Sequence, residues 1–234
     1  LGHGVTPTEQ AYSEIESKFR DCCVDGKVAV DEFLAHPKKD IRRGMSLIIR
    51  PSAEISERII AMQGRLGPLL GDQYFYPAGD LHMTVYSAIP VGASANFHAL
   101  DLPAYASAVK RTVVRSSAPF TLRFAGISAS DQAILVKGYP CDDQLRRLQD
   151  DILEEFQAMG FEFGAKRRFR NESAHITFAR FARQVPNLPA LRQALSDLQD
   201  FEFGKMTARE LQLFENDWYL RPNSLKEFGR FTLG

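Results

Sequence analysis

Two short segments decide the fold of this chain: LHMTV at residues 81–85 and AHITF at residues 174–178. Both read apolar, His, apolar, Thr, apolar. This alternation has the period of a half-buried β-strand, so it predicts two strands whose histidine and threonine share one face while the apolar residues face a core. Two matching half-sites can close on one ligand, and we expect a cleft where the two strands meet.

Histidine is scarce in this chain, so two His-x-Thr motifs are not expected by chance. Of the five histidines, only His82 and His175 are followed two residues later by a threonine, Thr84 and Thr177 respectively. A lone histidine on a strand is more often a satisfied core or surface group than a catalytic one. Two copies with the same partner at the same offset favour a functional pair.

The charge balance narrows the classes of ligand. Lys+Arg and Asp+Glu are equal at 29 each, so no global field draws the protein to a nucleic-acid backbone or an anionic membrane. We therefore expect no extended nucleic-acid footprint. The balance fits a small anionic ligand, or the end of an RNA, held by a few local groups.

Cysteine content and hydropathy predict the compartment. The three cysteines match neither a disulfide framework nor the spacing of a zinc site, which indicates a reducing environment. No apolar run is long enough to span a bilayer, and the N-terminus has no basic stretch leading into an apolar one. We expect a soluble, cytoplasmic protein without membrane contact.

The pattern of residues 1–43 differs from that of the rest of the chain, and we predict an N-terminal extension there, followed by one domain over residues 44–234. The extension contains an expected polar helix over 8–20 and a solvated connector at 37–40. Within the domain, apolar residues alternate between strand and helix periods. This pattern predicts strands near 46–50, 81–89, 120–124, 133–137, 174–181, 208–214 and 228–233, and helices near 55–69, 102–114, 145–159 and 188–198.

Each motif strand is flanked by helices in this order, as if one unit occurred twice. Beyond the motif itself, the two halves share no obvious repeat of residues. We therefore expect an α+β fold of two similar lobes, with antiparallel or mixed sheets around a central cleft.

Two imidazoles on separate strands suit a reaction that needs a base and an acid at the same pH. Histidine has an unperturbed pKa of about 6.5, so both of its forms are available near neutrality. In-line displacement at a phosphodiester needs one neutral histidine to activate the attacking water or hydroxyl and one protonated histidine to protonate the leaving oxygen. The threonine hydroxyls would hold the non-bridging oxygens and neutralise the charge that develops there.

Metal binding is the main competing chemistry for two histidines. Neither motif strand carries the Asp, Glu or Cys that usually completes a metal site, and threonine is a poor ligand. The chain also has no Gly-x-Ser-x-Gly nucleophile elbow and no Gly-x-x-x-x-Gly-Lys phosphate loop. We therefore expect neither a metal nor another cofactor.

These motifs resemble those of the two-histidine (2H) phosphoesterase superfamily, which includes the RNA 2′,3′-cyclic phosphodiesterases, also known as 2′-5′ RNA ligases. That superfamily is defined by a pair of His-x-Thr/Ser motifs, each followed by an apolar residue. The stretch RFR at 168–170 followed by AHITFAR at 174–180 is similar to the bacterial pattern, in which a basic stretch leads into His-x-Thr-Leu-Ala-Arg. The likeness extends to residues 45–70 and 211–233.

The resemblance implies a bilobed fold with internal pseudo-symmetry, a water-filled central cleft, no metal requirement and acid/base roles for the two histidines. It also implies that Arg180 binds the substrate phosphate, whereas a lone arginine at such a position is more often a surface charge at a strand end. Two departures leave the substrate open. The stretch VYSA at 85–88 replaces the apolar Phe-Leu-Gly ending of the RNA-processing branch, and residues 1–43 have no counterpart there.

Three further features have both a functional and a structural interpretation. Tyr86 lies two residues after Thr84, so by strand parity it can stack on a base or ribose, although a tyrosine on a half-buried strand more often packs. Trp218 is most simply a core or lobe-edge aromatic. The basic cluster within 166–170 can attract phosphates or form a solvated loop. Its members are Lys166, Arg167, Arg168 and Arg170.

The sequence therefore favours a metal-independent phosphodiesterase. Its expected substrate is a 2′,3′-cyclic phosphate, or a related cyclic or 2′-linked phosphodiester, of an RNA end or a small nucleotide. The alternative is a non-catalytic nucleotide-binding or RNA-end-binding module on the same fold. The motifs do not decide which histidine is the acid and which is the base.

Overall fold

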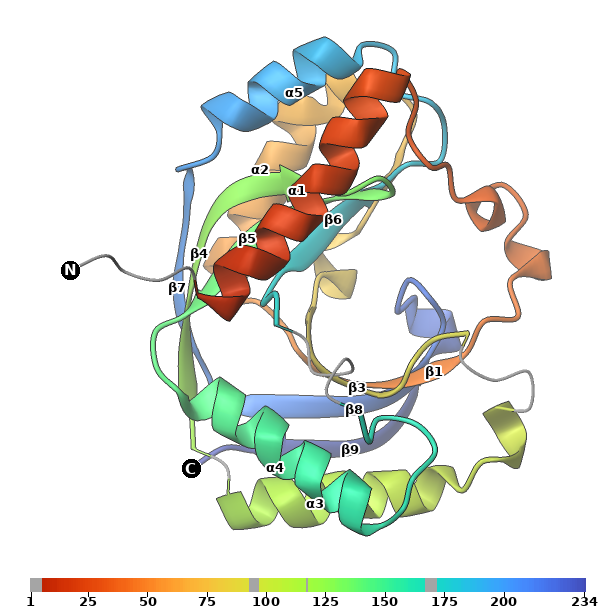
Figure 1. The fold of residues 1–234 in the computed structure, drawn as a ribbon, viewed down its shortest axis with the longest axis vertical. Helices are drawn as coiled ribbons and strands as arrows, with labels where there is room; N and C mark the ends of the chain where they lie inside the picture. Colours follow the sequence, from red (N-terminus) through yellow and green to blue (C-terminus); the bar gives the residue numbers. More distant parts are fainter. Residues whose placement is uncertain (1–5, 93–96, 117, 167–171) are drawn as a thin grey trace.

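The structure is a computed structural model that describes residues 6–92, 97–116, 118–166 and 172–234. Within these residues the strands form one sheet, which curls so that its two ends face different groups of helices (Figure 1). The strands are β1 (Gly44–Ile49), β2 (Tyr74–Phe75), β3 (Met83–Ile89), β4 (Phe120–Ala129), β5 (Ala133–Pro140), β6 (Ile176–Arg180), β7 (Glu202–Ala208), β8 (Glu210–Asn216) and β9 (Lys226–Thr232). The helices are α1 (Pro7–Asp25), α2 (Ala53–Leu70), α3 (Leu102–Ser116), α4 (Gln144–Ala158) and α5 (Leu188–Asp197).

The sheet places the two motif strands next to each other at its centre. Its order is β7-β4-β5-β6-β3-β1-β8-β9, and β2 pairs with β6 beside this path. All of these neighbours run antiparallel. The expected α+β class with an antiparallel sheet is confirmed. The division into two pseudo-symmetric lobes stays a prediction.

The helices pack on the outside of this sheet. In Figure 1, α3 and α4 lie side by side near β8 and β9, and α3 contacts β9. At the other end of the sheet α1 contacts β4 and α5, while α2 contacts β7 and α5. None of the helices in the described residues is both long and apolar enough to cross a bilayer.

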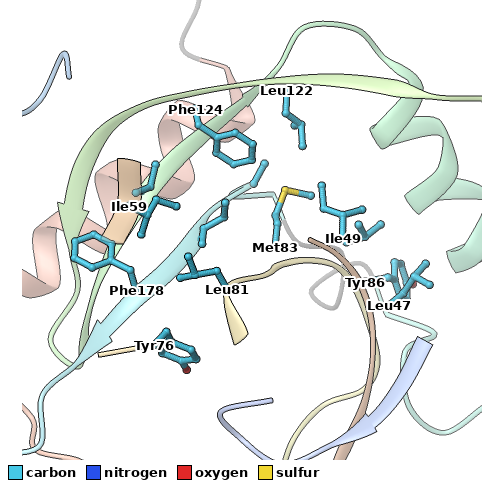
Figure 2. Close-up of a cluster of buried hydrophobic side chains, with 14 of the residues drawn as sticks. Leu47, Ile49, Ile59, Tyr76, Leu81, Met83, Tyr86, Leu122, Phe124 and Phe178 are labelled. Carbon is cyan, nitrogen blue, oxygen red and sulfur yellow. The ribbon is translucent and has the colours of Figure 1, made fainter. Parts of the chain in front are cut away.

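The apolar positions of both motif strands are buried in the main core, as the alternation predicts. In β3 and the residue pair before it, Leu81, Met83 and Val85 are at most 1% exposed. In the second motif Ile176 and Phe178 are fully buried. Figure 2 shows several of these side chains packed together, with Leu81 and Met83 beside residues from β1, β4 and α2. This packing leaves the polar positions of both strands on the opposite face.

The N-terminal segment packs against the domain. Helix α1 begins with a capping box between Thr6 and Glu9, and its buried Tyr12 both donates to Gly138 O at 2.9 Å and accepts from Gly138 N at 2.8 Å. Phe19 and Val28 belong to the same core cluster as the sheet. Residues of the predicted extension are therefore part of the core, and a boundary at residue 43 stays a prediction.

Candidate active site

The two motifs meet directly in the sheet. Their central residues, Met83 of β3 and Ile176 of β6, are paired in the antiparallel register. Extending this register by one residue in each direction places each histidine opposite the threonine of the other motif, with all four side chains on one face. The two half-sites expected from the sequence are thus brought together at the junction of β3 and β6.

The imidazole of His82 is held by the turn that precedes it. Its Nδ1 lies 2.8 Å from the main-chain oxygen of Asp80, which ends the short helix Ala78–Asp80. A carbonyl oxygen only accepts hydrogen bonds, so Nδ1 carries the hydrogen and Nε2 is the nitrogen that can exchange a proton. The residue is 9% exposed, so the ring is fixed in orientation and largely shielded from water.

His175 is held in the same way. Its Nδ1 lies 2.9 Å from the main-chain oxygen of Ser173, again two residues earlier, and 2.9 Å from the Ser173 hydroxyl. The residue before His175 lies very close to β5. A Cβ added to Gly138 of β5 would stand 1.9 Å from Ala174 O. Glycine at 138 is therefore what lets the strand before His175 approach β5 so closely.

Burial and positive charge lower the basicity of His82. Burial is the largest effect, and the bond to the Asp80 carbonyl opposes it. Three positive groups, Arg50, Arg180 and His175, act in the same direction as burial, and together these effects lower the pKa of His82 to about 4. His175 is thus one of the positive groups that lower the pKa of His82.

The environment of His175 is similar but carries fewer charges. Burial lowers its pKa most, the Ser173 carbonyl opposes this, and Arg180 lowers the pKa further. Both imidazoles are therefore held toward the neutral form when no anion is present. An anionic ligand beside them would favour protonation again, because an opposite charge stabilises the imidazolium.

The threonines share the histidine face, with Thr177 8% exposed and Thr84 half-buried. After its threonine, β3 departs from a strict period of two. Thr84 lies opposite Ile48 and Tyr86 lies opposite Leu47, so Val85 is an extra residue. Because neighbouring residues of β1 point to opposite faces, this bulge turns Tyr86 away from the face of Thr84.

The stacking role expected for Tyr86 is therefore corrected by the structure. Tyr86 is fully buried, its hydroxyl donates to Gly164 O at 2.6 Å, and its ring packs edge-on against Phe156. A side chain with no exposed surface cannot stack on a ligand, so Tyr86 is a core residue, as Figure 2 shows. Ser87, opposite Ser46, takes the place on the site face that parity assigned to Tyr86.

The corresponding bulge in β6 has the opposite consequence for Arg180. Thr177 lies opposite Leu135 and Ala179 lies opposite Ile134, so Phe178 is the extra residue. Arg180 then falls on the face of Thr177, where strict alternation would have placed it on the other face. Its electrostatic effect on both histidines agrees with this position.

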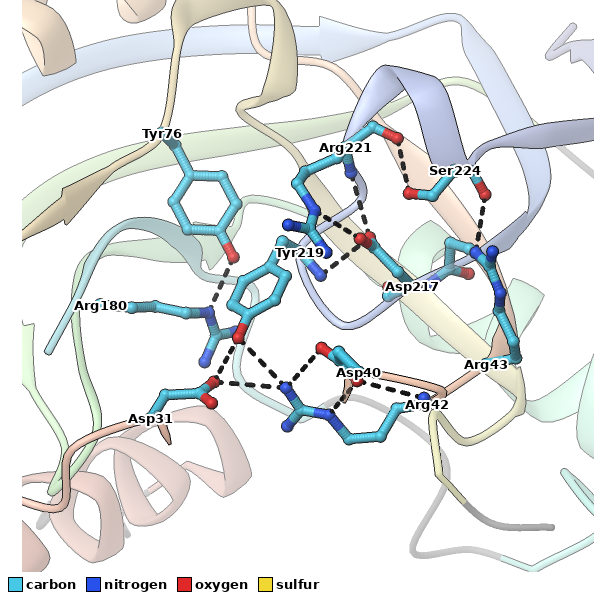
Figure 3. A network of polar contacts seen from close by, with 11 residues as sticks. Asp31, Asp40, Arg42, Arg43, Tyr76, Arg180, Asp217, Tyr219, Arg221 and Ser224 are labelled. Carbon is cyan, nitrogen blue, oxygen red and sulfur yellow. Dashed lines mark hydrogen bonds and ion pairs between the residues drawn. The ribbon is translucent and has the colours of Figure 1, made fainter. Parts of the chain in front are cut away.

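Arg180 is oriented by aromatic side chains that lie outside the two motifs (Figure 3). Its Nε donates to the hydroxyl of Tyr76 at 2.8 Å, and its guanidinium carbon lies 5.1 Å from the centre of a Trp218 ring. The Tyr76 ring in turn lies 6.1 Å from the ring of His82. The expectation of a core or edge position for Trp218 is confirmed, since this side chain is half-buried beside the site.

The N-terminal segment also reaches this aromatic wall. The hydroxyl of Tyr219 donates to Asp31 Oδ2 at 2.8 Å and accepts from Arg42 at 3.1 Å. The guanidinium of Arg42 stands 5.1 Å from a Trp218 ring, as that of Arg180 does. Figure 3 shows Asp31 and Arg42 converging on Tyr219 near Arg180. No local signal in the sequence links residues 31 and 42 to residue 219, because their contact arises only in the folded chain.

Comparison with known proteins decides the family. Residues 51–218, more than half of the chain, match the family described as the 2′-5′ RNA ligase superfamily. The chain belongs to the 2′-5′ RNA ligase superfamily. The resemblance of its paired motifs to those of 2H phosphoesterases is thereby confirmed. No curated protein matches the chain.

Solved structures with the superfamily fold are similar to this one at low sequence identity. TT0787 of Thermus thermophilus is 18% identical with a TM-score of 0.58, over 82% of this chain and 98% of that one. LigT of E. coli complexed with 3′-AMP is 18% identical with a TM-score of 0.53, over the same shares. ATU0111 of Agrobacterium tumefaciens, a conserved protein of unknown function, is 15% identical with a TM-score of 0.53, over 82% of this chain and 85% of that one. These likenesses concern the fold.

Two remaining expectations concern charge and metals. Within the described residues, no group of three or more His, Cys, Asp or Glu is arranged to hold a metal ion. Of the basic cluster, Arg167, Arg168 and Arg170 lie outside the described residues, as does the stretch 168–170 that contributed to the superfamily resemblance. Lys166 is described and is exposed.

Proposed function

We propose that this superfamily member is a metal-independent phosphodiesterase that hydrolyses a 2′,3′-cyclic phosphate, or a related cyclic or 2′-linked phosphodiester, of an RNA end or small nucleotide. The observation that carries the proposal is the matched support of the two histidines. Each is bound through Nδ1 to the carbonyl two residues earlier, on adjacent strands. Each imidazole therefore offers Nε2 for proton transfer at one shared site.

The proposed reaction uses the histidines as base and acid. One neutral imidazole takes a proton from water, whose oxygen forms the new bond to phosphorus. The bond from phosphorus to the 2′- or 3′-oxygen breaks, and the protonated imidazole gives its proton to that oxygen. The net change is addition of one water, and the product is a phosphomonoester beside a free hydroxyl.

The remaining residues stabilise the phosphate. The hydroxyls of Thr84 and Thr177 donate to its non-bridging oxygens, which gain charge in the transition state. Arg180 supplies a positive charge from the same face, and Tyr76 and Trp218 hold its guanidinium in place. The phosphate also compensates the low pKa of the acid histidine, because its negative charge favours the imidazolium.

Nucleotide ligands are consistent with what is seen for a protein of similar fold. LigT of E. coli is complexed with 3′-AMP, with NADP+ and with ATP in solved structures. For the present chain we propose a small nucleotide or the end of an RNA as the substrate. The equal numbers of acidic and basic residues, 29 each, favour such a compact ligand over a long polyanion.

The test is a turnover screen in the presence of EDTA. Candidate substrates are nucleoside 2′,3′-cyclic phosphates, oligonucleotides with cyclic ends, 2′-5′ oligoadenylate and ADP-ribose cyclic phosphate. We expect hydrolysis of at least one of them to survive exhaustive chelation. Loss of that activity in EDTA, with recovery on addition of one divalent metal, would contradict the metal-independent mechanism.

A second candidate function is a non-catalytic module that binds nucleotides or RNA ends. The lowered pKa of both imidazoles favours it, because an acid catalyst must hold a proton. The two candidates differ in the screen. A binding module would take up a nucleoside 2′-monophosphate without hydrolysing any phosphodiester, whereas the enzyme would do both.

A further inference from the structure

A pocket of about 480 Å³ opens at Asp80, two residues before His82. It draws its walls from the N-terminal segment, from the chain leading into β3 and from the loop after β8. The lining residues are Pro37, Lys38, Tyr74, Asp80, Arg221 and residues 222–224. Its volume lies in the range that small ligands occupy, roughly 300 to 1,000 Å³.

Asp80 joins this pocket to the proposed catalytic site. Its main-chain oxygen holds His82 at 2.8 Å, while the residue also lines the pocket. A second link runs through aromatic rings, since Tyr74 lies 5.1 Å from Tyr76 and Tyr76 lies 6.1 Å from His82, measured between ring centres. A nucleotide with its phosphate at His82 therefore has the pocket within reach of its base.

The side chain of Asp80 is largely shielded from solvent, it lines the pocket, and it has no donor within the described residues. The residue is 6% exposed, and no group in the described residues donates a hydrogen bond to its side chain or forms an ion pair with it. Burial raises the pKa of Asp80, with Asp217 acting in the same direction and Arg50 opposing it. A carboxylate that is shielded from most of the solvent gains from hydrogen-bond donors, so a ligand that presents N–H groups fits this position.

The other lining side chains suit the remainder of a nucleotide. The half-buried ring of Tyr74 offers an aromatic wall, and the carboxylate of Asp80 acts on its phenol electrostatically. Lys38 is exposed, and Arg221 keeps 32% of its side chain exposed while its Nε binds Asp217 at 2.7 Å. Two cations at the rim favour an anionic ligand, and an aromatic wall favours a planar one.

We propose that this pocket binds the guanine base of the substrate nucleotide, which makes the site selective for guanosine. The proposal rests on the proposed phosphodiesterase function. Among the four RNA bases, only guanine presents two neighbouring donors, N1–H and the N2 amino group, on its Watson–Crick edge. The two oxygens of the Asp80 carboxylate accept both, and the base stacks on Tyr74.

The test compares kcat/KM for guanosine, inosine, adenosine and cytidine 2′,3′-cyclic phosphates. We expect the wild-type protein to prefer guanosine over adenosine by about 10- to 100-fold, as for other bidentate base contacts. Inosine, which lacks the N2 amino group, should fall between them. Asp80→Asn should lower kcat/KM for guanosine far more than for adenosine and so remove the preference, because the change removes the carboxylate while the main-chain bond to His82 is retained.

Two further variants separate this effect from damage to the fold. Tyr74→Leu should lower kcat/KM for all four substrates by about 5- to 100-fold through lost stacking, while the preference for guanosine remains. Glu57→Gln removes one exposed carboxylate from α2 and should change neither rate nor preference. Thermal unfolding of each variant reports whether it is folded.

The outcomes distinguish this proposal from the proposed function. Equal kcat/KM for guanosine and adenosine in the wild-type protein, or an unchanged preference in a folded Asp80→Asn variant, overturns the guanine pocket while the phosphodiesterase stands. If Asp80→Asn does not fold, the comparison of guanosine with inosine on the wild-type protein decides. If no cyclic phosphate is hydrolysed, the phosphodiesterase fails, and calorimetric binding of guanosine against adenosine 2′-monophosphate still tests the pocket.

Discussion

The two motif strands are alike in sequence and backbone, and they differ in what surrounds them. In each, the strand begins directly after the histidine and a bulge follows directly after the threonine. In each, the carbonyl two residues before the histidine holds its Nδ1. The difference lies at the next position on the shared face, where β3 carries Ser87 and β6 carries Arg180.

This difference makes a near-symmetric pair of half-sites electrically unequal. Only the β6 half-site carries an arginine at this position. Three positive groups lower the pKa of His82, whereas one lowers the pKa of His175. Two identical groups take different roles when their surroundings separate their pKa values. In the substrate-free protein His82 is held neutral by more charges, so we favour His82 as the base and His175 as the acid.

Removal of either motif imidazole should have the largest effect on the rate of hydrolysis. We expect His82→Ala and His175→Ala each to lower kcat by about 10² to 10⁴, the usual contribution of one acid or base group. The matched control is His98→Ala, an exposed histidine outside the motifs, which should keep full activity. Initial rates on the best cyclic phosphate give the answer. A folded variant that lacks one motif histidine and hydrolyses at the wild-type rate would end the two-histidine mechanism.

The threonines should affect turnover more than binding. Thr84→Val and Thr177→Val remove donors that act on oxygens gaining charge in the transition state, and each should lower kcat by up to about 10² to 10³. Affinity for a nucleoside 2′-monophosphate should change much less, and calorimetry measures it. If the valine variants bind this product more weakly and the wild-type protein turns over no phosphodiester, the binding-module interpretation replaces the enzyme.

Substitutions at the position after each bulge, Ser87 in β3 and Arg180 in β6, test whether the two half-sites are functionally unequal. Arg180→Gln should lower kcat/KM by about 10- to 100-fold, since it removes a charged hydrogen-bond donor from the phosphate. Ser87→Ala, the equivalent change in β3, should have little effect. Steady-state kinetics of the two variants measure the contrast. Equal losses at the two positions would show that the half-sites are functionally symmetric.

Much of this site was predictable because the period of a strand is local information. The alternation in residues 81–85 and 174–178 predicted two strands with buried apolar positions, and Leu81, Met83, Ile176 and Phe178 are all buried. The helical spacing over 55–69 likewise predicted α2, which spans Ala53–Leu70. These features depend on neighbours within a few residues, and the sequence displays them directly.

The parts that escaped prediction depend on partners far along the chain. A bulge is defined by the strand opposite, so the pattern of β3 alone could not show that Val85 is an extra residue and that Tyr86 turns into the core. The contacts of Asp31 and Arg42 with Tyr219 join the two ends of the chain. Nothing in the pattern of these residues points to the site, so the sequence alone predicts only an extension there.

The unequal surroundings of the histidines should also appear as a pH dependence of stability. The pKa of His82 is about 4 in the folded protein and about 6.5 when unfolded, so between these values the unfolded chain binds more protons. The depressed pKa therefore contributes stability that is fully present above pH 6.5 and is lost as the pH falls toward 4. The free energy of unfolding cannot change by more than about 1.4 kcal/mol per pH unit through this one group.

Urea unfolding at a series of pH values measures this pH dependence for the wild-type protein and for His82→Asn, which cannot titrate. We expect the variant to lose less stability than the wild-type protein between pH 6.5 and pH 4. Identical pH dependences would mean that His82 is protonated as easily in the folded protein as in the unfolded chain, and the argument for it as the base would then be wrong.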